Sequence, residues 1–176
     1  MSSGMNRKLV AAAVGLAALL IAALPAAAAG AKGTRANPYP LHKTVLLPNG
    51  KGWKLTVNSA VPNATRIVLK APGSYSAQRG EQYFLINLTL VYTGKGSASV
   101  YSAYDLTAAA RSGLVYTRLN DDCGGIPHPL ADFKKVHTGG SLTGNICFSV
   151  VQKDARGLLL KCVPTASQRT KVFFKL

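Results

Sequence analysis

GEQYFLINLTLVY, residues 80–92, is the longest β-like stretch of the chain and decides its fold class. Its large apolar side chains recur at every second position, so that Phe84, Ile86, Leu88 and Leu90 share one parity. Successive side chains of a strand point to opposite faces of the sheet. The pattern therefore predicts a central strand with one fully apolar face and one mixed face that is partly covered.

A second alternating stretch spans residues 53–61 and begins with Trp53 on its apolar side. This inward parity predicts that Trp53 anchors the core, and a tryptophan that stacks on a sugar is the alternative. Residues 66–70 repeat the alternation over a shorter length, which predicts a strand with Ile67 and Leu69 inward.

Turn residues separate the remaining strand-like stretches, and helix-period apolar patterning is absent after residue 30. The chain is therefore predicted to be all-β, and many short strands within one domain indicate a β-sandwich. Residues 30–40 contain glycine and proline and are expected to form a flexible linker, which leaves residues 41–176 for the sandwich. The remaining predicted strands are residues 43–47, 100–109, 113–117, 146–151, 158–163 and 172–176.

Residues 1–29 have the pattern of a secretory signal peptide. Arg7 and Lys8 precede an apolar segment, residues 9–24, and the small residues up to Ala29 fit an A-x-A cleavage site. An uncleaved membrane anchor is the alternative, but the segment is mostly alanine, which inserts into a bilayer less favourably than leucine or isoleucine. We expect cleavage near Ala29 and a secreted, extracellular product.

Basic residues far outnumber acidic ones, with 21 Lys and Arg against 6 Asp and Glu, a formal net charge of +15. Loss of Arg7 and Lys8 with the signal peptide leaves 19 basic residues and a charge of +13. Such a charge favours an anionic cell-wall polymer, lipid headgroups or an acidic protein as partner, whereas the alternative is solubility alone. The cations on predicted outward parities, and so the candidate anionic-surface residues, are Lys54, Arg66, Lys70, Lys161, Lys171 and Lys175.

Exposed aromatic residues between the basic ones would indicate single-stranded nucleic-acid binding. The candidates, Tyr75, Tyr101 and Phe173, are scattered along the chain. We therefore predict no specific nucleic-acid partner.

Catalytic motifs are missing from the sequence. The GGSLT stretch at residues 139–143 departs from the nucleophile elbow at its last position, where glycine is needed. His128, Asp132 and His137 could meet as metal ligands, although their spacing matches no regular zinc site. The sequence predicts a non-enzymatic binding module without a cofactor, and the alternative is a small extracellular metal-dependent hydrolase that uses these three residues.

The three cysteines, Cys123, Cys147 and Cys162, all lie in the part predicted to be exported, where a disulfide can persist. Cys147 shares the outward parity of Ser149, whereas Cys162 shares the inward parity of Leu160. Side chains on opposite faces are poorly placed for a bridge. We therefore predict a Cys123–Cys147 disulfide and a buried Cys162 thiol that acts as a small hydrophobic residue.

Several motifs follow one another in an order that covers nearly the whole chain after residue 37: Asn37-Pro38 with Leu41, WKLTV at 53–57, GEQYFLINLT at 80–89, GGSLTGNICF at 139–148 and VFF at 172–174. In this order the chain resembles the exported immunoglobulin-like proteins of actinobacteria and other Gram-positive bacteria known as the DUF4352 family, similar to the MPT63-type secreted antigens. The resemblance implies an antiparallel immunoglobulin-like β-sandwich and export. It implies no activity, because the family has no agreed biochemical function, and Cys162 departs from the family pattern.

Overall fold

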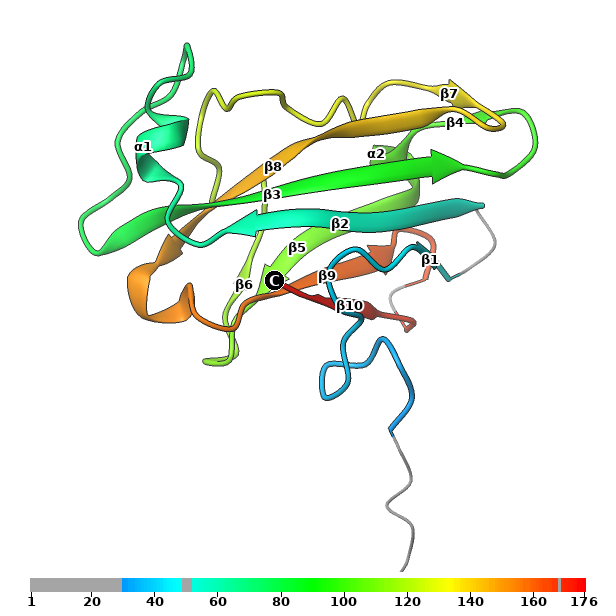
Figure 1. The fold of residues 1–176 in the computed structure, drawn as a ribbon, viewed down its shortest axis with the longest axis horizontal. Coiled ribbons are helices and arrows are strands. Elements are labelled where there is room, and N and C mark those ends of the chain that lie inside the picture. The colour runs from blue at the N-terminus through cyan, green and yellow to red at the C-terminus, as the bar shows by residue number, and fades with distance from the viewer. Residues whose placement is uncertain (1–29, 49–51, 168) are drawn as a thin grey trace, which may run out of the picture.

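Two four-stranded antiparallel sheets form the molecule in a computed structural model that describes residues 30–48, 52–167 and 169–176. The predicted signal peptide lies outside the described residues. The two sheets lie one above the other as a sandwich (Figure 1). The first sheet has the order β1 (Val45–Leu46), β2 (Trp53–Val61), β3 (Glu81–Tyr92) and β8 (Ser141–Val151). The second has the order β10 (Val172–Lys175), β9 (Leu159–Pro164), β5 (Tyr104–Ala109) and β6 (Val115–Tyr116).

The smaller elements lie at the ends of the sandwich. The helix α1 (Thr65–Val68) lies at one end, and the two-stranded ladder of β4 (Ser97–Ala98) and β7 (Val136–His137) lies at the other (Figure 1). A second short helix, α2 (Val100–Ala103), leads into β5, and a 3-10 helix, η1 (Gln152–Asp154), follows β8. None of the helices in the described part of the chain has the length and apolar character needed to cross a membrane.

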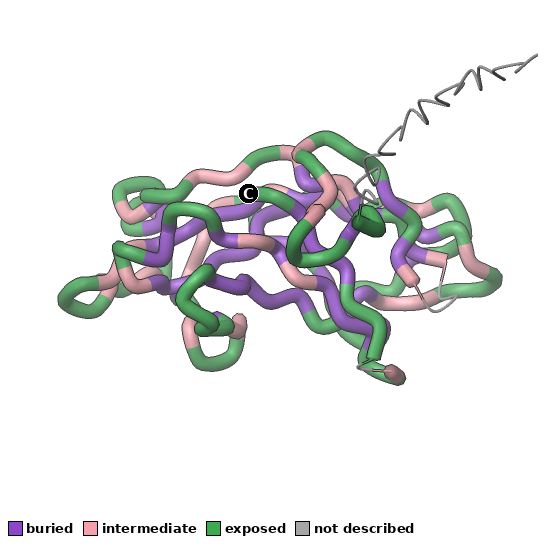
Figure 2. The backbone as a smooth tube through the Cα atoms, turned by 90° about the horizontal axis from the view of Figure 1, so that it is seen from below, coloured by how far each residue is buried: buried purple, intermediate pink, exposed green. Residues whose placement is uncertain are grey.

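The central strand is β3, which pairs with β2 on one side and with β8 on the other. Its predicted inward residues Phe84, Ile86, Leu88 and Leu90 are buried in the main core between the sheets. Burial is concentrated along the strands and falls off in the loops (Figure 2). The predictions of a central strand and of an antiparallel β-sandwich are confirmed.

Trp53 is fully buried in the main core and packs on Tyr92, with ring centroids 5.0 Å apart. A ring with no solvent access cannot stack on a sugar. The structure therefore confirms Trp53 as a core anchor.

The strand predicted for residues 66–70 is wrong, because Thr65–Val68 form α1. Ile67 and Leu69 are exposed, whereas Ala64 and Val68 are buried. Residues four apart lie on the same face of a helix, and this pair packs on the outer face of β3. Five alternating residues are too few to separate a strand from one helical turn.

The strand predicted for residues 100–109 is half correct, because its first four residues form α2. The Ser99 side chain caps this helix by accepting a hydrogen bond from the backbone N–H of Ser102. Regular β-structure begins at Tyr104 and continues as β5.

Part of the predicted linker lies along the free edge of β10. The Phe173 N–H donates to the Gly33 carbonyl at 2.8 Å, and the Tyr39 N–H donates to the Phe173 carbonyl at 2.9 Å. The Tyr39 ring also packs on Phe174, with centroids 5.6 Å apart. An edge strand has backbone groups without partners, and residues 33–39 provide partners for them. Residues 30–40 were expected to form a flexible linker, whereas these contacts attach residues 33–39 to the second sheet.

Candidate functional site

The Cys123–Cys147 disulfide forms as predicted, with the two Cα atoms 6.0 Å apart. Cys147 lies on the outer face of the first sheet, opposite Leu85 in register, and Cys123 comes from the loop after β6. With Ala64, Val68 and Tyr83, these residues form a second apolar cluster outside the main core. The bridge thus fixes a long loop on the mixed face of β3. Cys162 is fully buried in the main core, also as predicted.

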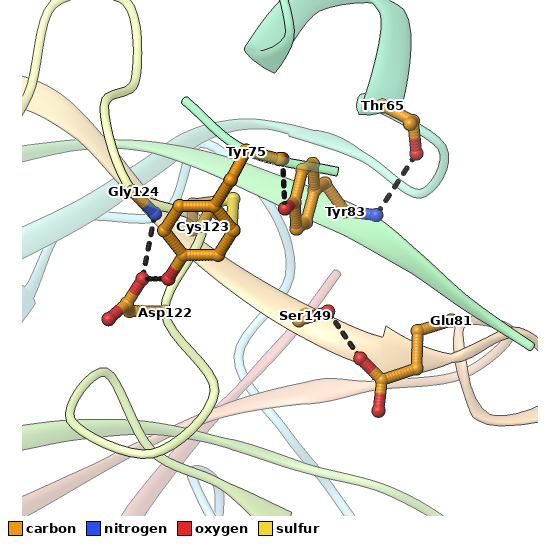
Figure 3. Close-up of a disulfide and its surroundings, with 9 residues drawn as sticks. Thr65, Tyr75, Glu81, Tyr83, Asp122, Cys123, Gly124 and Ser149 are labelled. Atoms are coloured by element: carbon orange, nitrogen blue, oxygen red, sulfur yellow. Dashed lines mark hydrogen bonds between the residues drawn. A yellow bond between two sulfur atoms is a disulfide. The ribbon is translucent and has the colours of Figure 1, made fainter. Parts of the chain in front are cut away.

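Acidic side chains near the disulfide are engaged in local hydrogen bonds (Figure 3). Asp122 accepts from the Tyr75 hydroxyl and from the Gly124 N–H, the latter at 2.7 Å. Glu81 accepts from the Ser149 hydroxyl at 2.6 Å. These carboxylates stabilise the loop and the sheet edge.

The same holds for most of the acidic residues in the chain. Asp121 accepts from the Thr117 N–H, and Asp154 accepts from the hydroxyls of Ser112 and Tyr116. Asp132 binds Arg118 at 2.5 Å, which is the sole ion pair among the described residues. Only Asp105, of the six acidic side chains, accepts no hydrogen bond from any of the residues described. Arg118 is therefore the one cation of the described residues that a carboxylate pairs with.

The six predicted anionic-surface residues do not form one face. Lys161 pairs in register with Phe173, and Lys171 and Lys175 lie two residues to either side of Phe173. These three lysines therefore share the outer side of the second sheet. The other three lie elsewhere: Lys54 is on the outer side of the first sheet, and Arg66 and Lys70 are in and just after α1.

A cleft of about 440 Å³ lies where β5 ends, β9 begins and β10 ends. We call it the cationic cleft, because its lining includes Arg35, Arg111 and Lys175. No Asp or Glu side chain is among its lining residues. The cleft therefore concentrates three cations around one hollow, and none of them forms an ion pair within the described residues.

Backbone geometry shapes the cationic cleft. The Arg35 guanidinium donates to the Ala110 carbonyl, which holds the N-terminal segment over the end of β5. Gly157 has φ +81°, and a Cβ atom there would lie 2.6 Å from Arg111 Nε. Only glycine adopts this conformation easily, and its missing side chain leaves space for Arg111.

Sequence reasoning found Lys175 but missed the other two cations of the cleft. Arg35 was assigned to the linker, and Arg111 lies in a turn where strand parity gives no direction. No periodic signal could have identified them, because the fold alone brings the three residues together.

The residues of the alternative metal site are not grouped in the structure. Asp132 is buried and its carboxylate binds Arg118, while His137 lies in β7 opposite Ser97. Within residues 30–48, 52–167 and 169–176, no cluster of three histidine, cysteine or acidic side chains could hold a metal ion. The geometry therefore gives no support to metal-dependent hydrolysis.

The protein is an antiparallel β-sandwich in which a disulfide attaches a long loop to the first sheet and the cationic cleft lies at the end of the second. No family model matches the chain, and no curated protein is similar to it in sequence. Among solved structures, it is similar to MPT63, a secreted protein from Mycobacterium tuberculosis, with a TM-score of 0.51 and 16% identity over 80% of this chain and 97% of that chain. Membership of the DUF4352 family stays a prediction.

Two further solved structures match the fold more weakly. An uncharacterized β-sandwich protein from Clostridium difficile gives a TM-score of 0.49 and 12% identity, over 80% of this chain and 95% of that chain. The yjhA protein from Bacillus subtilis gives a TM-score of 0.48 and 13% identity, over 78% of this chain and 99% of that chain. At these identities, the likenesses concern the fold alone.

Proposed function

We propose that the protein is an exported, non-enzymatic binding module that contacts an anionic polymer through the cationic cleft. One observation carries this proposal: Arg35, Arg111 and Lys175 line the same hollow, and none of them has an ion-pair partner among the described residues. Cations held together without counter-charges repel one another, and a bound anion removes that repulsion.

The chemistry of the cleft favours a phosphate or carboxylate group as ligand. A guanidinium presents its N–H groups in a planar fork that matches the oxygens of either group, and an ammonium adds a point charge. Lys161 and Lys171, on the same side of the second sheet, extend the positive surface beyond the cleft. A repeating anionic polymer could therefore contact the cleft and the sheet together.

The expected location is consistent with such a ligand. Residues 1–29 have the pattern of a signal peptide, and the structurally similar MPT63 is described as a secreted protein. Outside the membrane, bacterial cell walls present anionic polymers, and lipid headgroups or an acidic protein offer the same charge.

Retention on isolated cell walls of the producing organism tests the proposal. We expect the purified chain from residue 30 onward to be retained at low salt and released at about 0.3 M NaCl, because salt screens exposed charges. The triple variant Arg35→Gln, Arg111→Gln, Lys175→Gln should lose retention at low salt. Lipid vesicles with and without anionic headgroups, used in place of the walls, identify the source of the anion.

A matched control removes the same number of charges elsewhere. The triple variant Lys54→Gln, Arg66→Gln, Lys70→Gln should remain bound, because these residues lie outside the cleft. Equal loss of retention in both triple variants would show that net charge alone is responsible and would overturn the proposal. Thermal melting of each variant checks that the fold is kept.

A further inference from the structure

A second cleft, of about 670 Å³, lies between α2, the first half of β5, the segment after β6 and the loop that leads to β7. We call it the aromatic cleft, and its lining includes Tyr101, Tyr104, Asp105, Arg118, Leu119 and Phe133. It shares no lining residue with the cationic cleft. Its function is therefore separate from the one proposed above.

The apolar part of the aromatic cleft is unusually exposed. Leu119 is 87% exposed, Phe133 68% and Tyr101 56%, which are high fractions for large apolar side chains. The rings of Tyr101 and Phe133 pack on each other, with centroids 4.1 Å apart and planes inclined by 30°. Exposed apolar side chains gathered around one hollow mark a binding site on a soluble protein.

The polar part of the cleft offers both donors and acceptors. Asp105 accepts no hydrogen bond from the described residues, and Arg118 uses one of its nitrogens, Nη2, to bind Asp132. The Tyr101 hydroxyl and the Asn120 side-chain amide donate no hydrogen bond to any of the described residues. A ligand in the cleft can therefore both donate and accept hydrogen bonds while one side of it contacts the rings.

Internal contacts hold these groups in place. Asp132 is 5% exposed, and its backbone carbonyl accepts from the Tyr101 N–H at 3.1 Å, which ties the loop to α2. The Tyr104 hydroxyl donates to the Pro48 carbonyl at 2.8 Å. These contacts fix the backbone at Tyr101 and Asp132 and the ring of Tyr104, and groups that are already held in place bind at a lower entropic cost.

We infer that the aromatic cleft binds a neutral saccharide. A pyranose ring has an apolar face of C–H groups that packs on aromatic rings, and its hydroxyls both donate and accept hydrogen bonds. An acyl chain would cover the Asp105 carboxylate without giving it a partner, which carries a desolvation cost. An organic cation would gain from Asp105 but would offer no acceptor to the nitrogens of Arg118 that are not bound to Asp132. A saccharide uses the rings, the carboxylate and these guanidinium nitrogens together.

Nuclear magnetic resonance titration of the isotopically labelled mature chain tests this inference. The probes are maltotriose, cellotriose and chitotriose, with tetramethylammonium chloride as an organic cation. We expect saturable shifts, with at least one trisaccharide, of the backbone amides of residues 101–106, 117–120 and 132–133. Phe133→Ala should weaken that binding about three- to tenfold, because it removes an aromatic contact.

Leu46→Ala is the matched control, because Leu46 is 62% exposed and lies in β1, outside the cleft. It should leave the saccharide affinity unchanged. Asp105→Asn keeps the size of the side chain and should weaken saccharide binding without abolishing it. Absence of saturable shifts with all three trisaccharides, or shifts caused by tetramethylammonium alone, would overturn the inference. Shifts that follow protein concentration without any ligand would also overturn it and would assign the cleft to a second copy of the chain.

Discussion

The hydroxyl of Tyr116 donates a hydrogen bond to Oδ2 of Asp154 at 2.8 Å, and the Ser112 hydroxyl donates to the same oxygen at 2.9 Å. Both Tyr116 and Asp154 are buried. A buried carboxylate is tolerated only while it is hydrogen-bonded. The pair therefore joins β6 to η1 through a bond whose loss would be costly.

Removal of this hydroxyl should destabilise the fold. Tyr116→Phe deletes one of the two donors to Asp154, so we expect the free energy of unfolding to fall by about 1–3 kcal/mol. Urea unfolding measures the change. Tyr101→Phe, which alters an exposed hydroxyl, serves as the control. A cost below about 0.3 kcal/mol would show that Ser112 alone satisfies the carboxylate.

Stability should decrease at high pH. Burial, together with the hydrogen bond to Asp154, raises the pKa of Tyr116 to about 12, and burial also raises the pKa of Tyr104 to about 12. Because the folded state holds these protons above the ordinary pKa of about 10, the unfolded state binds fewer protons between pH 10 and 12. The contribution of these two tyrosines to the free energy of unfolding is then constant well below pH 10 and falls across that interval.

Chemical denaturation at a series of pH values measures this dependence. Tyr116→Phe should show a shallower decrease than the wild type, since one of the groups with a raised pKa is gone. An unchanged slope in the variant would assign the effect to other groups.

Loss of the disulfide should weaken the fold without abolishing it. Cys123 and Cys147 are 24 residues apart in sequence. Closure of a loop of this size lowers the entropy of the unfolded chain and so stabilises the folded state by about 3 kcal/mol. We expect the double variant Cys123→Ser, Cys147→Ser to lose about this much stability. Dithiothreitol should destabilise the wild type similarly and leave the double variant unaffected, whereas further destabilisation of the variant would point to another target of the reductant.

Cys162 should be inert in the folded protein. Its side chain is fully buried, and burial raises the pKa of its thiol well above the ordinary value. Because the thiolate is the reactive form, a thiol reagent at pH 8 should leave Cys162 unlabelled in the native chain. It should label one cysteine per chain in denaturant. Rapid labelling of the native state would show that the second sheet opens locally.

Gly144 should tolerate no side chain. A Cβ atom there would lie 2.6 Å from Leu130 Cα and 2.7 Å from Leu130 N, so the backbone of residues 129–130 would have to move. We expect Gly144→Ala to cost about 1–3 kcal/mol through overpacking. Ser141→Ala on the same strand, at an exposed position, is the control in urea unfolding. Equal stability of the two variants would show that the loop adjusts freely.

The alternation of apolar and polar residues predicted the long strands correctly, because successive side chains of a strand point to opposite faces of the sheet. It identified the inward face of β3 and the opposite parities of Cys147 and Cys162, and so the disulfide. It failed at α1, where too few residues were available to distinguish a helical turn.

Neither cleft could be predicted from the sequence. The cationic cleft combines Arg35, Arg111 and Lys175 from three separate parts of the chain, and the aromatic cleft brings Tyr101 against Phe133. Such convergence depends on strand order and on the paths of loops, which local patterns do not encode. Parity indicates which way a side chain points, but not which side chains from other strands lie beside it.

The segment that lies along β10 has a consequence for association between copies of the chain. Residues 33–39 occupy the open side of β10, residues 128–130 bond to Asn145 on the open side of β8, and the outer strands β1 and β6 are two residues long each. A foreign strand therefore finds the edge of β10 and part of the edge of β8 already paired, and addition of a strand to a free edge is the step that begins fibril growth between copies. The folded sandwich is thereby protected from edge-to-edge association of copies at these two edges.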